Sequence, residues 1–501
     1  MATVSGVPKA TPQTPISIFQ IKFRITVPFN MLATHLALTL TLLTPSLASF
    51  IPSTAQIITE VDHLLNPLPS VLHVDPTYYD ELSGIKRKLC TLTSLGEGRD
   101  DTDNFLEAVE KCGKGGIIRL PDPTYLISRP LTIELSHATL DLHGFLTFST
   151  DIKYWIDHRI EFPFQNQSLG FIISGHDFTL EGNDVGGIDG NGQVWYDWAK
   201  DFGNKFGRPM SLAVKDAKNV VIKNWSIIQP QFWASIIIDS ENVLMKDVYV
   251  NASSFNPESK VDEKNWLQNT DGCDTYRSHN VTFENFVYQG GDDCLAFKPN
   301  STMITARNVS CYGGSGIAFG SIAQYEGVVD IIEDIVLEDI KLYPSSQCPG
   351  YQGIYFKSWI GESHGTHPNG GGGGEGYCRN VTIKDVYMED IMNPIAVDTS
   401  LTYLPDVKGR PNLKPSKFQW YDIHLSNFTG NGLRNRIIWM DCSRTLPCYD
   451  WTFDRMEMTP GKTDHPEITY VCNNMILDGS DGLDQCHPSN STLETDNGGT
   501  L

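Results

Sequence analysis

Between about residue 170 and residue 460, one short pattern of polar and apolar positions returns along the chain. Each clear copy begins with Asn, continues with Val and alternating apolar positions, and ends with Asp or Asn. These copies run over residues 219–224, 242–247, 280–285 and 380–385, and looser ones over 332–339 and 418–427. Alternation of this kind predicts β-strands with one buried face, and the polar ends predict turns between them.

The spacing of the copies predicts how the strands are arranged. The first two copies begin 23 positions apart. A repeat of this length with several short strands is typical of a solenoid, in which each coil packs on its neighbours. We therefore predict an all-β fold, a right-handed parallel β-helix that forms a single elongated domain over residues 85–470. An array of antiparallel sandwiches is the alternative. A doubly wound α/β sheet is disfavoured, because no helical stretches alternate with the strands.

Three carboxylates are expected to meet on this solenoid. Strands of adjacent coils lie about 4.8 Å apart, so residues one period apart become neighbours. Asp271 precedes the Asp292–Asp293 pair by 21 positions, about one coil. Crowded carboxylates repel one another, which raises at least one pKa, and glycoside hydrolysis needs one protonated acid and one ionised base. A calcium site and a set of solvated turn residues are the alternatives.

Composition narrows the class of protein. The chain has 501 residues, of which 60 are acidic and 38 basic, giving a formal net charge of −22. This excess of negative charge disfavours a nucleic-acid binder or a protein that binds anionic membranes. A hydrophobic fraction of 40% with 20% charged residues disfavours bulk disorder and a polytopic membrane protein.

The N-terminus has the pattern of a secretory signal peptide. No acidic residue precedes Glu60, and an apolar run over residues 31–43 is followed by Ser46-Leu47-Ala48. We predict a signal peptide over residues 1–48, with Met31 as an alternative start. The apolar run is shorter than the roughly 20 residues that a membrane-spanning helix needs. We expect an extracellular protein with no membrane anchor, an N-terminal extension over 49–84 and a tail over 471–501.

Potential glycosylation sites agree with secretion. The N-x-[ST] pattern occurs at Asn166, Asn224, Asn251, Asn280, Asn300, Asn308, Asn380, Asn427 and Asn490.

The cysteines also agree with secretion. Because there are 11 of them, at least one is not paired within the chain. Sequence spacing predicts the pairs Cys442–Cys448, Cys472–Cys486, Cys90–Cys112, Cys294–Cys311 and Cys348–Cys378, which leaves Cys273 over.

A glycine-rich run spans residues 369–376. It lacks the Lys-Ser/Thr pair that a phosphate-binding loop requires, so it predicts a flexible surface loop.

Four blocks resemble, in order, the signatures of glycoside hydrolase family 28, the polygalacturonase family. They are residues 269–272, 291–294, 314–316 and 355–357. Residues 101–112, 115–121 and 188–193 also resemble the family's opening helix, its first strand and a later block. The resemblance covers about residues 85–460. It implies a right-handed β-helix, a pectic polysaccharide substrate, and inverting hydrolysis without a cofactor or metal; we expect a monomer.

The resemblance also implies roles for single residues. Asp292 matches the general acid that protonates the glycosidic oxygen, and Asp271 and Asp293 match the pair that activates water. Asn269 is expected to orient these carboxylates by hydrogen bonding. Lys357 matches a lysine that binds the carboxylate of an acidic sugar. Cys294 and Cys311 match a family disulfide that closes the turn carrying the acid.

Two positions depart from the family pattern. Ser315 stands where the family has histidine, and Tyr355 stands where it has arginine. Both family residues help to hold galacturonate, and serine can donate a hydrogen bond but cannot carry a charge. We expect Asn269, Ser315, Lys357 and Arg277 to contact substrate.

The chain resembles the exo-acting members of the family most over residues 274–278 and 297–300. We predict an exo-acting enzyme that releases terminal galacturonate. An exo-rhamnogalacturonan hydrolase or α-L-rhamnosidase is the second hypothesis. A non-catalytic solenoid that binds pectin is the third.

Overall fold

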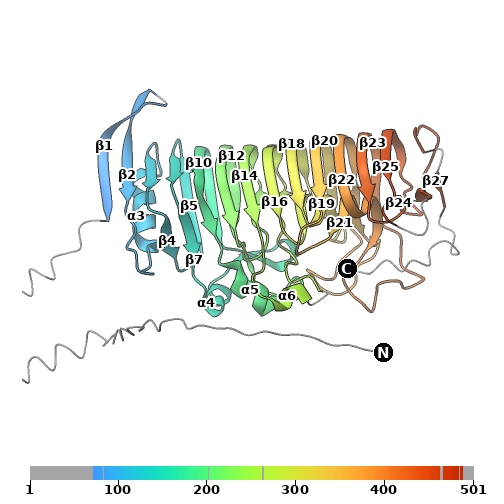
Figure 1. Ribbon diagram of the computed structural model, residues 1–501, viewed down its shortest axis with the longest axis horizontal. Coiled ribbons are helices and arrows are strands. Elements are labelled where there is room, and N and C mark those ends of the chain that lie inside the picture. The colour runs from blue at the N-terminus through green and yellow to red at the C-terminus, as the bar shows by residue number, and fades with distance from the viewer. Residues whose placement is uncertain are drawn as a thin grey trace, which may run out of the picture. The chain divides into compact units, whose positions relative to one another are not determined.

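The computed structural model describes residues 71–488, apart from residues 83, 201, 262–263, 463–466 and 484–485. The predicted signal peptide, the first part of the extension and the sequon at Asn490 lie outside the described residues. Parallel strands stack coil upon coil (Figure 1). The predicted parallel β-helix is therefore confirmed.

Each coil contributes to three parallel sheets. The first, here called the site sheet, contains β5 (Leu131–Ser136), the first parts of β10 (Phe171–Asp189) and β12 (Leu212–Ile228), β13 (Ser235–Ile238), β15 (Cys273–Tyr276), β17 (Asp293–Phe297), β19 (Gly314–Ile322), β21 (Gly350–Trp359), the end of β22 (Glu375–Leu401), β24 (Arg436–Asp441), β26 (Thr469–Asn473) and β27 (Cys486–His487). The site sheet thus continues past residue 470.

The second and third sheets share long, bent strands. In each of them one segment pairs in the second sheet and the segment that follows it pairs in the third. These strands are β10, β12, β14 (Glu241–Asn251), β16 (His279–Gln289), β18 (Ser301–Tyr312), β20 (Val329–Tyr343), β22, β23 (Lys417–Gly432) and β25 (Tyr449–Thr459). The second sheet also contains β2 (Ile85–Leu92), β3 (Ile117–Leu120) and β6 (Thr139–Leu142), and the third contains β4 (Thr124–Ile127) and β7 (Phe145–Phe148).

The polar residues that begin and end each sequence repeat form the bends between sheets. Asn219 and Asn242, which begin two copies, have φ of 56° and 58°, and Asn224 and Asp247, which end them, have φ of 50° and 54°. Asn and Asp tolerate this left-handed backbone better than other non-glycine residues. Their side chains also bond from coil to coil, since Asn242 Nδ2 donates to Asn219 Oδ1 over 2.9 Å. The repeat is therefore a turn–strand–turn unit.

The apolar positions of the repeat build the core inside the coils. Val220 pairs in register with Val243, which pairs with Val281, and all three are buried. Burying a side chain of this size contributes about 1.5–3 kcal/mol relative to leaving it exposed. The same stacking repeats along the described coils, so the core is one continuous column.

The N-terminal end of the core column is covered by a helix. α3 (Thr102–Cys112) packs on β2 and buries Phe105 and Ala108, and Cys112 is joined to Cys90. β1 (Leu72–Asp80) pairs antiparallel with β2, so it departs from the parallel pattern. The helix expected over residues 101–112 is confirmed.

Connections from the third sheet back to the site sheet carry short elements. α4 (Ile152–Asp157), α5 (Gly192–Ala199) and α6 (Glu258–Val261) lie along one side of the stack in Figure 1. β8 (Ile160–Phe162), β9 (Gln167–Leu169) and β11 (Pro209–Met210) form a small separate sheet, and η3 (Phe164–Asn166) lies between β8 and β9. Over the residues that the structure describes, no helix is long and apolar enough to cross a membrane.

Four predicted disulfides are confirmed and one is wrong. Those present are Cys90–Cys112, Cys294–Cys311, Cys442–Cys448 and Cys472–Cys486. Cys348 and Cys378 are both free, as is Cys273. Cys378 faces the core within the second sheet, whereas Cys348 lies in the loop before β21, where its thiol is 3.3 Å from Asn265 Oδ1. Sequence spacing could not reveal that the two thiols point to different surroundings.

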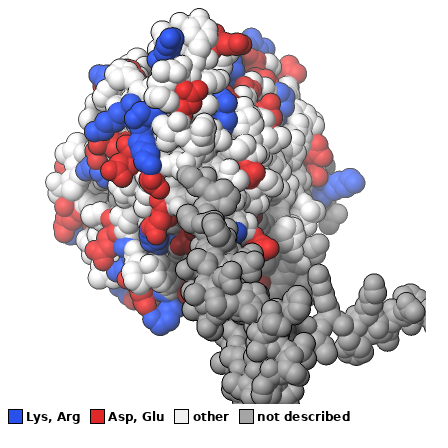
Figure 2. All heavy atoms as spheres, turned by 90° about the vertical axis from the view of Figure 1, so that its left-hand side faces the viewer, with Lys and Arg blue, Asp and Glu red and all other residues white. Residues whose placement is uncertain are grey.

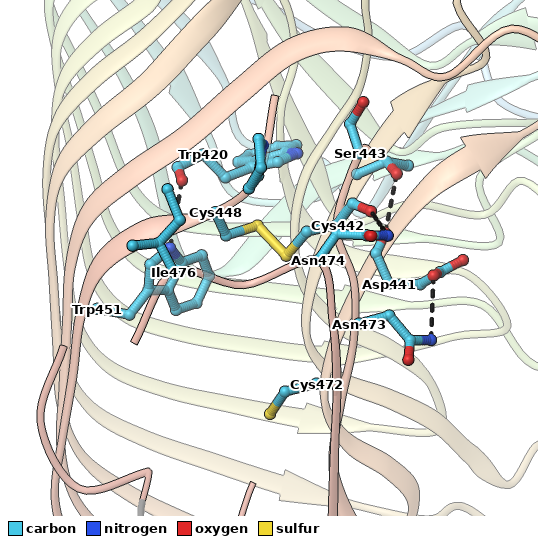
Figure 3. The surroundings of a disulfide bond; sticks show 12 residues. Trp420, Asp441, Cys442, Ser443, Cys448, Trp451, Cys472, Asn473, Asn474 and Ile476 are labelled. Atoms are coloured by element: carbon cyan, nitrogen blue, oxygen red, sulfur yellow. Dashed lines mark hydrogen bonds between the residues drawn. A yellow bond between two sulfur atoms is a disulfide. The ribbon is translucent and has the colours of Figure 1, made fainter. Parts of the chain in front are cut away.

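The Cys442–Cys448 bridge closes the short connection between β24 and β25 (Figure 3). Asn474 donates from Nδ2 to the carbonyl of Cys442 over 2.9 Å. On the other side of the bridge, the indole of Trp451 donates to the carbonyl of Trp420 over 3.3 Å.

The eight described sequon asparagines lie on the surface to different degrees. Asn166, Asn280, Asn308 and Asn380 are exposed, and Asn224, Asn251, Asn300 and Asn427 are half-buried. Acidic and basic side chains are interspersed on the face shown in Figure 2.

Candidate active site

The three carboxylates expected to meet do lie together. Asp271 comes two residues before β15, Asp292 directly precedes β17, and Asp293 is the first residue of β17. β15 and β17 are adjacent parallel strands of the site sheet. One carboxylate oxygen from each residue lies within 4.8 Å of the others. A water molecule can donate to two oxygens at this separation, since each hydrogen bond spans about 2.7–2.8 Å.

Asn269 fixes the position of Asp292. Its backbone is left-handed, with φ of 59°, and its N–H donates to Asp292 Oδ2 over 2.9 Å. Its own side-chain oxygen accepts from the N–H of Asn204 over 2.6 Å. On the next strand, Ser315 donates its N–H to the carbonyl oxygen of Asp292 over 2.9 Å. Asn269 therefore lies where the sequence hypothesis placed it, although it acts through its backbone.

Two buried lysines hold the carboxylates. Lys357 Nζ lies 2.6 Å from Asp293 Oδ2. Lys298 Nζ lies 3.2 Å from Asp274, 3.7 Å from Asp293 and 3.9 Å from Asp271. Both lysines are almost fully buried, at 6% and 3% exposure. Such pairs remain ionised because each charge compensates the other where water is excluded.

Burial and mutual repulsion shift the carboxyl groups toward the protonated state. Burial, together with Asp292 and Asp274, raises the pKa of Asp271 well above its ordinary value. Burial and the charge of Asp293 raise the pKa of Asp292 as well. Burial raises the pKa of Asp274 to about 7, against the opposing effect of Lys298. The cluster can therefore hold a proton at a pH where exposed carboxyl groups are ionised.

Arg208 adds a third buried cation. Its side chain is 1% exposed and donates to the backbone carbonyls of Gln231 and Gln268 over 2.9 and 3.0 Å. Burial lowers the pKa of Arg208 to about 10, while Asp292 and Asp271 oppose this change, so the guanidinium is charged at acid and neutral pH. Four carboxyl groups, of which Asp292 is half-buried and the others are buried, thus face three cations. One retained proton balances the charge, which is the state that acid–base hydrolysis requires.

Sequence reasoning missed three of these residues. Asp274 and Lys298 fall inside the two stretches that resemble exo-acting relatives, and that signal could have identified them. Arg208 lies in a connection without any recognisable motif, and only the fold brings it to the carboxylates.

Other expected residues have different places. Arg277 follows β15, at the other end of the strand from Asp271, and its guanidinium pairs with Asp239 over 2.6 and 2.5 Å. Ser315 is the Cα partner of Asp293 on the adjacent strand. Tyr355 directs its ring toward Lys357, whose Nζ lies 5.1 Å from the ring centre.

The glycine-rich run is not a surface loop, contrary to expectation. Residues 370–374 are buried. Gly371 pairs with His364, and Gly372 donates its N–H to the carbonyl of Gln324 over 2.7 Å. A Cβ on Gly374 would lie 2.7 Å from the backbone of Ala323. Glycine is therefore needed here because the backbones pack closely. A glycine-rich sequence looks the same whether the glycines allow close packing or flexibility.

The carboxylate trio does not fit a calcium site. Calcium takes six to eight oxygen ligands. Here the ammonium groups of Lys298 and Lys357 lie within 4 Å of the trio and already compensate its charge. A divalent cation added between them would be repelled by both. The arrangement suits proton transfer better than metal binding.

A cluster of carboxylates on a parallel β-helix is an arrangement that acid–base glycoside hydrolysis can use. The family model for "Glycosyl hydrolases family 28" matches residues 129–477. The chain belongs to this family, as the four sequence blocks predicted.

This chain aligns with most of the length of two curated relatives. A protein of Aspergillus flavus, whose name assigns it as a galacturan 1,4-alpha-galacturonidase A, is 48% identical over 388 residues, 75% of this chain and 89% of the relative. An Aspergillus niger protein named alpha-L-rhamnosidase is 32% identical over 417 residues, 82% of this chain and 93% of the relative.

The fold also matches solved structures. The endo-xylogalacturonan hydrolase of Aspergillus tubingensis superposes with a TM-score of 0.66 at 22% identity, covering 80% of this chain and 99% of that one. A polygalacturonase of Erwinia carotovora gives a TM-score of 0.55 at 19% identity, covering 77% and 95%. At these identities the match concerns the β-helix alone.

Proposed function

We propose that the protein is an extracellular, exo-acting pectin hydrolase that releases terminal galacturonic acid with inversion of configuration. The 48% identical relative is named for this activity on galacturan, and the three carboxylates of the family site are all present. Four disulfides among the described residues support an oxidising, extracellular environment.

The observation that carries the exo assignment is an apolar cover over one part of the site sheet. A second hydrophobic cluster lies outside the core column and contains Phe162, Phe164, Leu169, Ile172, Met210, Ala213, Phe232, Trp233, Ile236 and Ile238. Along each strand its members alternate with core residues, so they face outward. Ile236 is the Cα partner of Asp274, so the cover ends where the charged site begins.

Hydrogen bonds tie this cover to segments beyond the site. The N–H of Gln165 donates to Tyr325 Oη over 2.7 Å, and its side-chain amide donates to Gln324 over 2.9 Å. Asn204 Nδ2 donates to Asn369 Oδ1 over 3.1 Å. A polymer that ran along the whole outer face would have to displace these contacts. A chain end that stops at the carboxylates would not, and this favours terminal cleavage.

Catalysis divides between the carboxylates. Asp292 donates a proton to the glycosidic oxygen as the bond to the leaving sugar breaks. Asp271 and Asp293 hold a water molecule, and Asp293, whose negative charge Lys357 stabilises, takes its proton as that water attacks the anomeric carbon. Both have a buried oxygen without a hydrogen-bond partner among the described residues, so each is available to accept from the water. Attack on the face opposite the leaving group inverts the configuration.

The sugar carboxylate meets positive charge at the same place. Lys357 and Lys298 line the carboxylate cluster, and Arg208 has a terminal nitrogen with no partner among the described residues. Because an ammonium group has three donors, we expect Lys357 to bind the sugar carboxylate while it stays paired with Asp293, in place of the family histidine and arginine that Ser315 and Tyr355 replace. An acidic terminal sugar therefore remains the favoured substrate.

A second candidate is hydrolysis of a terminal neutral sugar such as rhamnose. Ser315 and Tyr355 are uncharged, and one 32% identical relative is named alpha-L-rhamnosidase. Lys357 is also paired with Asp293 rather than free.

Product analysis separates the two. Purified enzyme is incubated with polygalacturonate and with rhamnogalacturonan oligosaccharides, and products are separated by anion-exchange chromatography. We expect galacturonate monomer from the first substrate from the earliest time points. Rhamnose from the second substrate, without galacturonate from the first, would contradict the proposal.

A further inference from the structure

Two imidazoles and a carboxylate converge on the surface near the N-terminal coils. His137 follows β5, and His176 and Asp177 lie at the matching bend of β10 in the next coil. Asp177 Oδ2 lies 2.8 Å from His176 Nδ1 and 3.8 Å from His137 Nδ1. One donor atom from each residue lies within 4.8 Å of the others. β10 is three strands along the site sheet from β15, so this cluster is separate from the catalytic carboxylates.

We propose that His137, His176 and Asp177 bind a zinc ion. In tetrahedral zinc sites, bonds of about 2.0–2.2 Å place neighbouring ligand atoms roughly 3.3–3.5 Å apart. The separations of 2.8 and 3.8 Å to Asp177 lie on either side of that value. The two imidazoles are 51% and 67% exposed, so small side-chain rotations can bring all three atoms to the required distance.

The backbone holds the ligands in place before any ion arrives. His137 and Asp177 have left-handed φ of 49° and 54°. The N–H of His137 donates to the carbonyl of His176 over 3.1 Å, and the two rings meet edge to face with centres 5.0 Å apart. The positions of the two rings are therefore set by adjacent coils rather than by a mobile loop.

A neighbouring asparagine orients the carboxylate. Asn219 Nδ2 donates to Asp177 Oδ1 over 2.8 Å, which leaves Oδ2 facing the imidazoles. Metal sites commonly use such partners to fix the direction of a ligand. The nearby guanidinium of Arg87 pairs with Asp80 over 3.1 Å, so its charge is compensated.

The surroundings leave space for a fourth ligand. His137 and Asp177 line a shallow hollow of about 360 Å³ that Arg87 and Thr139 also line. Water can complete the coordination from this side. Two nitrogen donors favour zinc and similar transition metals over magnesium or calcium, which prefer oxygen ligands. Because the ligands come from two successive coils, a bound ion stabilises the folded N-terminal coils.

Calorimetric titration tests the site directly. Full-length protein is freed of metals with EDTA, dialysed, and titrated at pH 7.5 with zinc chloride. We expect one zinc ion per chain, and no binding of magnesium at the same concentrations. The double variant His137→Gln/His176→Gln should lose affinity by at least tenfold, and Asn219→Ala should lose about 10- to 100-fold.

His143→Gln is the matched control, because His143 is an exposed histidine 3.4 Å from a single carboxylate, Asp141. This control should bind zinc as the wild type does, and all variants should keep hydrolytic activity. Visible absorption of bound cobalt should change in the double variant but not in the control. Zinc binding by the double variant equal to that of wild type, or an equal loss in His143→Gln, would overturn the proposal.

Discussion

Lys357 Nζ lies 2.6 Å from Oδ2 of Asp293, and both side chains of this ion pair are buried. Burial alone would lower the pKa of Lys357, but Asp293 raises it well above its ordinary value. The lysine is thus held by the proposed catalytic base, at the place where we expect an acidic sugar to bind. It therefore affects both binding and chemistry.

Lys357→Met should lower kcat and raise KM on polygalacturonate. Losing a charge-assisted hydrogen bond costs about 1.5–3 kcal/mol, which is roughly 10- to 150-fold in kcat/KM. Steady-state kinetics checks both constants. Lys341→Met, which removes a surface lysine 2.8 Å from Asp339, should change neither. A rise in KM with unchanged kcat would show that Lys357 contacts only the sugar.

Asp292→Asn should abolish most hydrolysis without loss of fold. An amide has no acidic proton for the leaving oxygen, and general acid catalysis commonly supplies about 10²–10⁴-fold. Asp271→Asn and Asp293→Asn should be severe as well, because both hold the water. Asp454→Asn, which alters an exposed carboxylate, serves as control. Turnover above half of the wild-type value in Asp292→Asn would remove this residue from the role of acid.

Much of the fold could be predicted from the sequence, because the repeat is local. The turn residues Asn219 and Asn242 and the valines after them each act within their own coil, so their spacing reveals the solenoid. The meeting of the three carboxylates could be predicted as well, since about one period separates Asp271 from the Asp292–Asp293 pair.

Contacts made by the long connections could not be predicted in this way. Arg208 reaches the site from a segment outside the repeat, and Cys348 is separated from Cys378 by its loop. The packing of residues 370–374 depends on the backbones beside them, which no local pattern specifies.

Hydrolysis should survive removal of metals with EDTA. The proposed mechanism uses only carboxyl groups and lysines. Because Lys298 and Lys357 lie against the three carboxylates, they leave no place for a metal cation among them. Activity is measured on polygalacturonate after dialysis against EDTA and after adding back calcium or zinc. Loss of activity that calcium restores would contradict the mechanism, whether or not zinc binds at His137 and His176.

Loosening the apolar cover should change the products. Tyr325 accepts the N–H of Gln165 over 2.7 Å, and its ring stacks on His367 with centres 4.1 Å apart. Tyr325→Ala removes both contacts, so longer chain segments should pass the carboxylates and dimers or trimers should join the monomer among early products. Tyr387→Ala, at an exposed tyrosine, should leave the product pattern unchanged. Monomer alone from Tyr325→Ala would show that this contact does not limit cleavage to the chain end.

Stability should depend on pH through Asp330. This side chain is buried beside β19 and accepts the N–H of Ala323 over 2.9 Å, and burial raises the pKa of Asp330 to about 6. The folded state therefore binds this proton more tightly than the unfolded chain does. Its contribution to stability is complete below about pH 4 and is lost as the pH rises through about 6.

Asp330→Asn keeps an oxygen acceptor but cannot ionise, so it should gain stability relative to wild type as the pH rises from 4 to 7. The full shift of about two pKa units corresponds to roughly 3 kcal/mol. Thermal unfolding at pH 4, 5, 6 and 7 measures the difference in Tm between variant and wild type. Asp454→Asn, which alters a carboxylate that is 62% exposed, is the matched control. A Tm difference for Asp330→Asn that does not change with pH would mean that Asp330 titrates alike in the folded and unfolded chain.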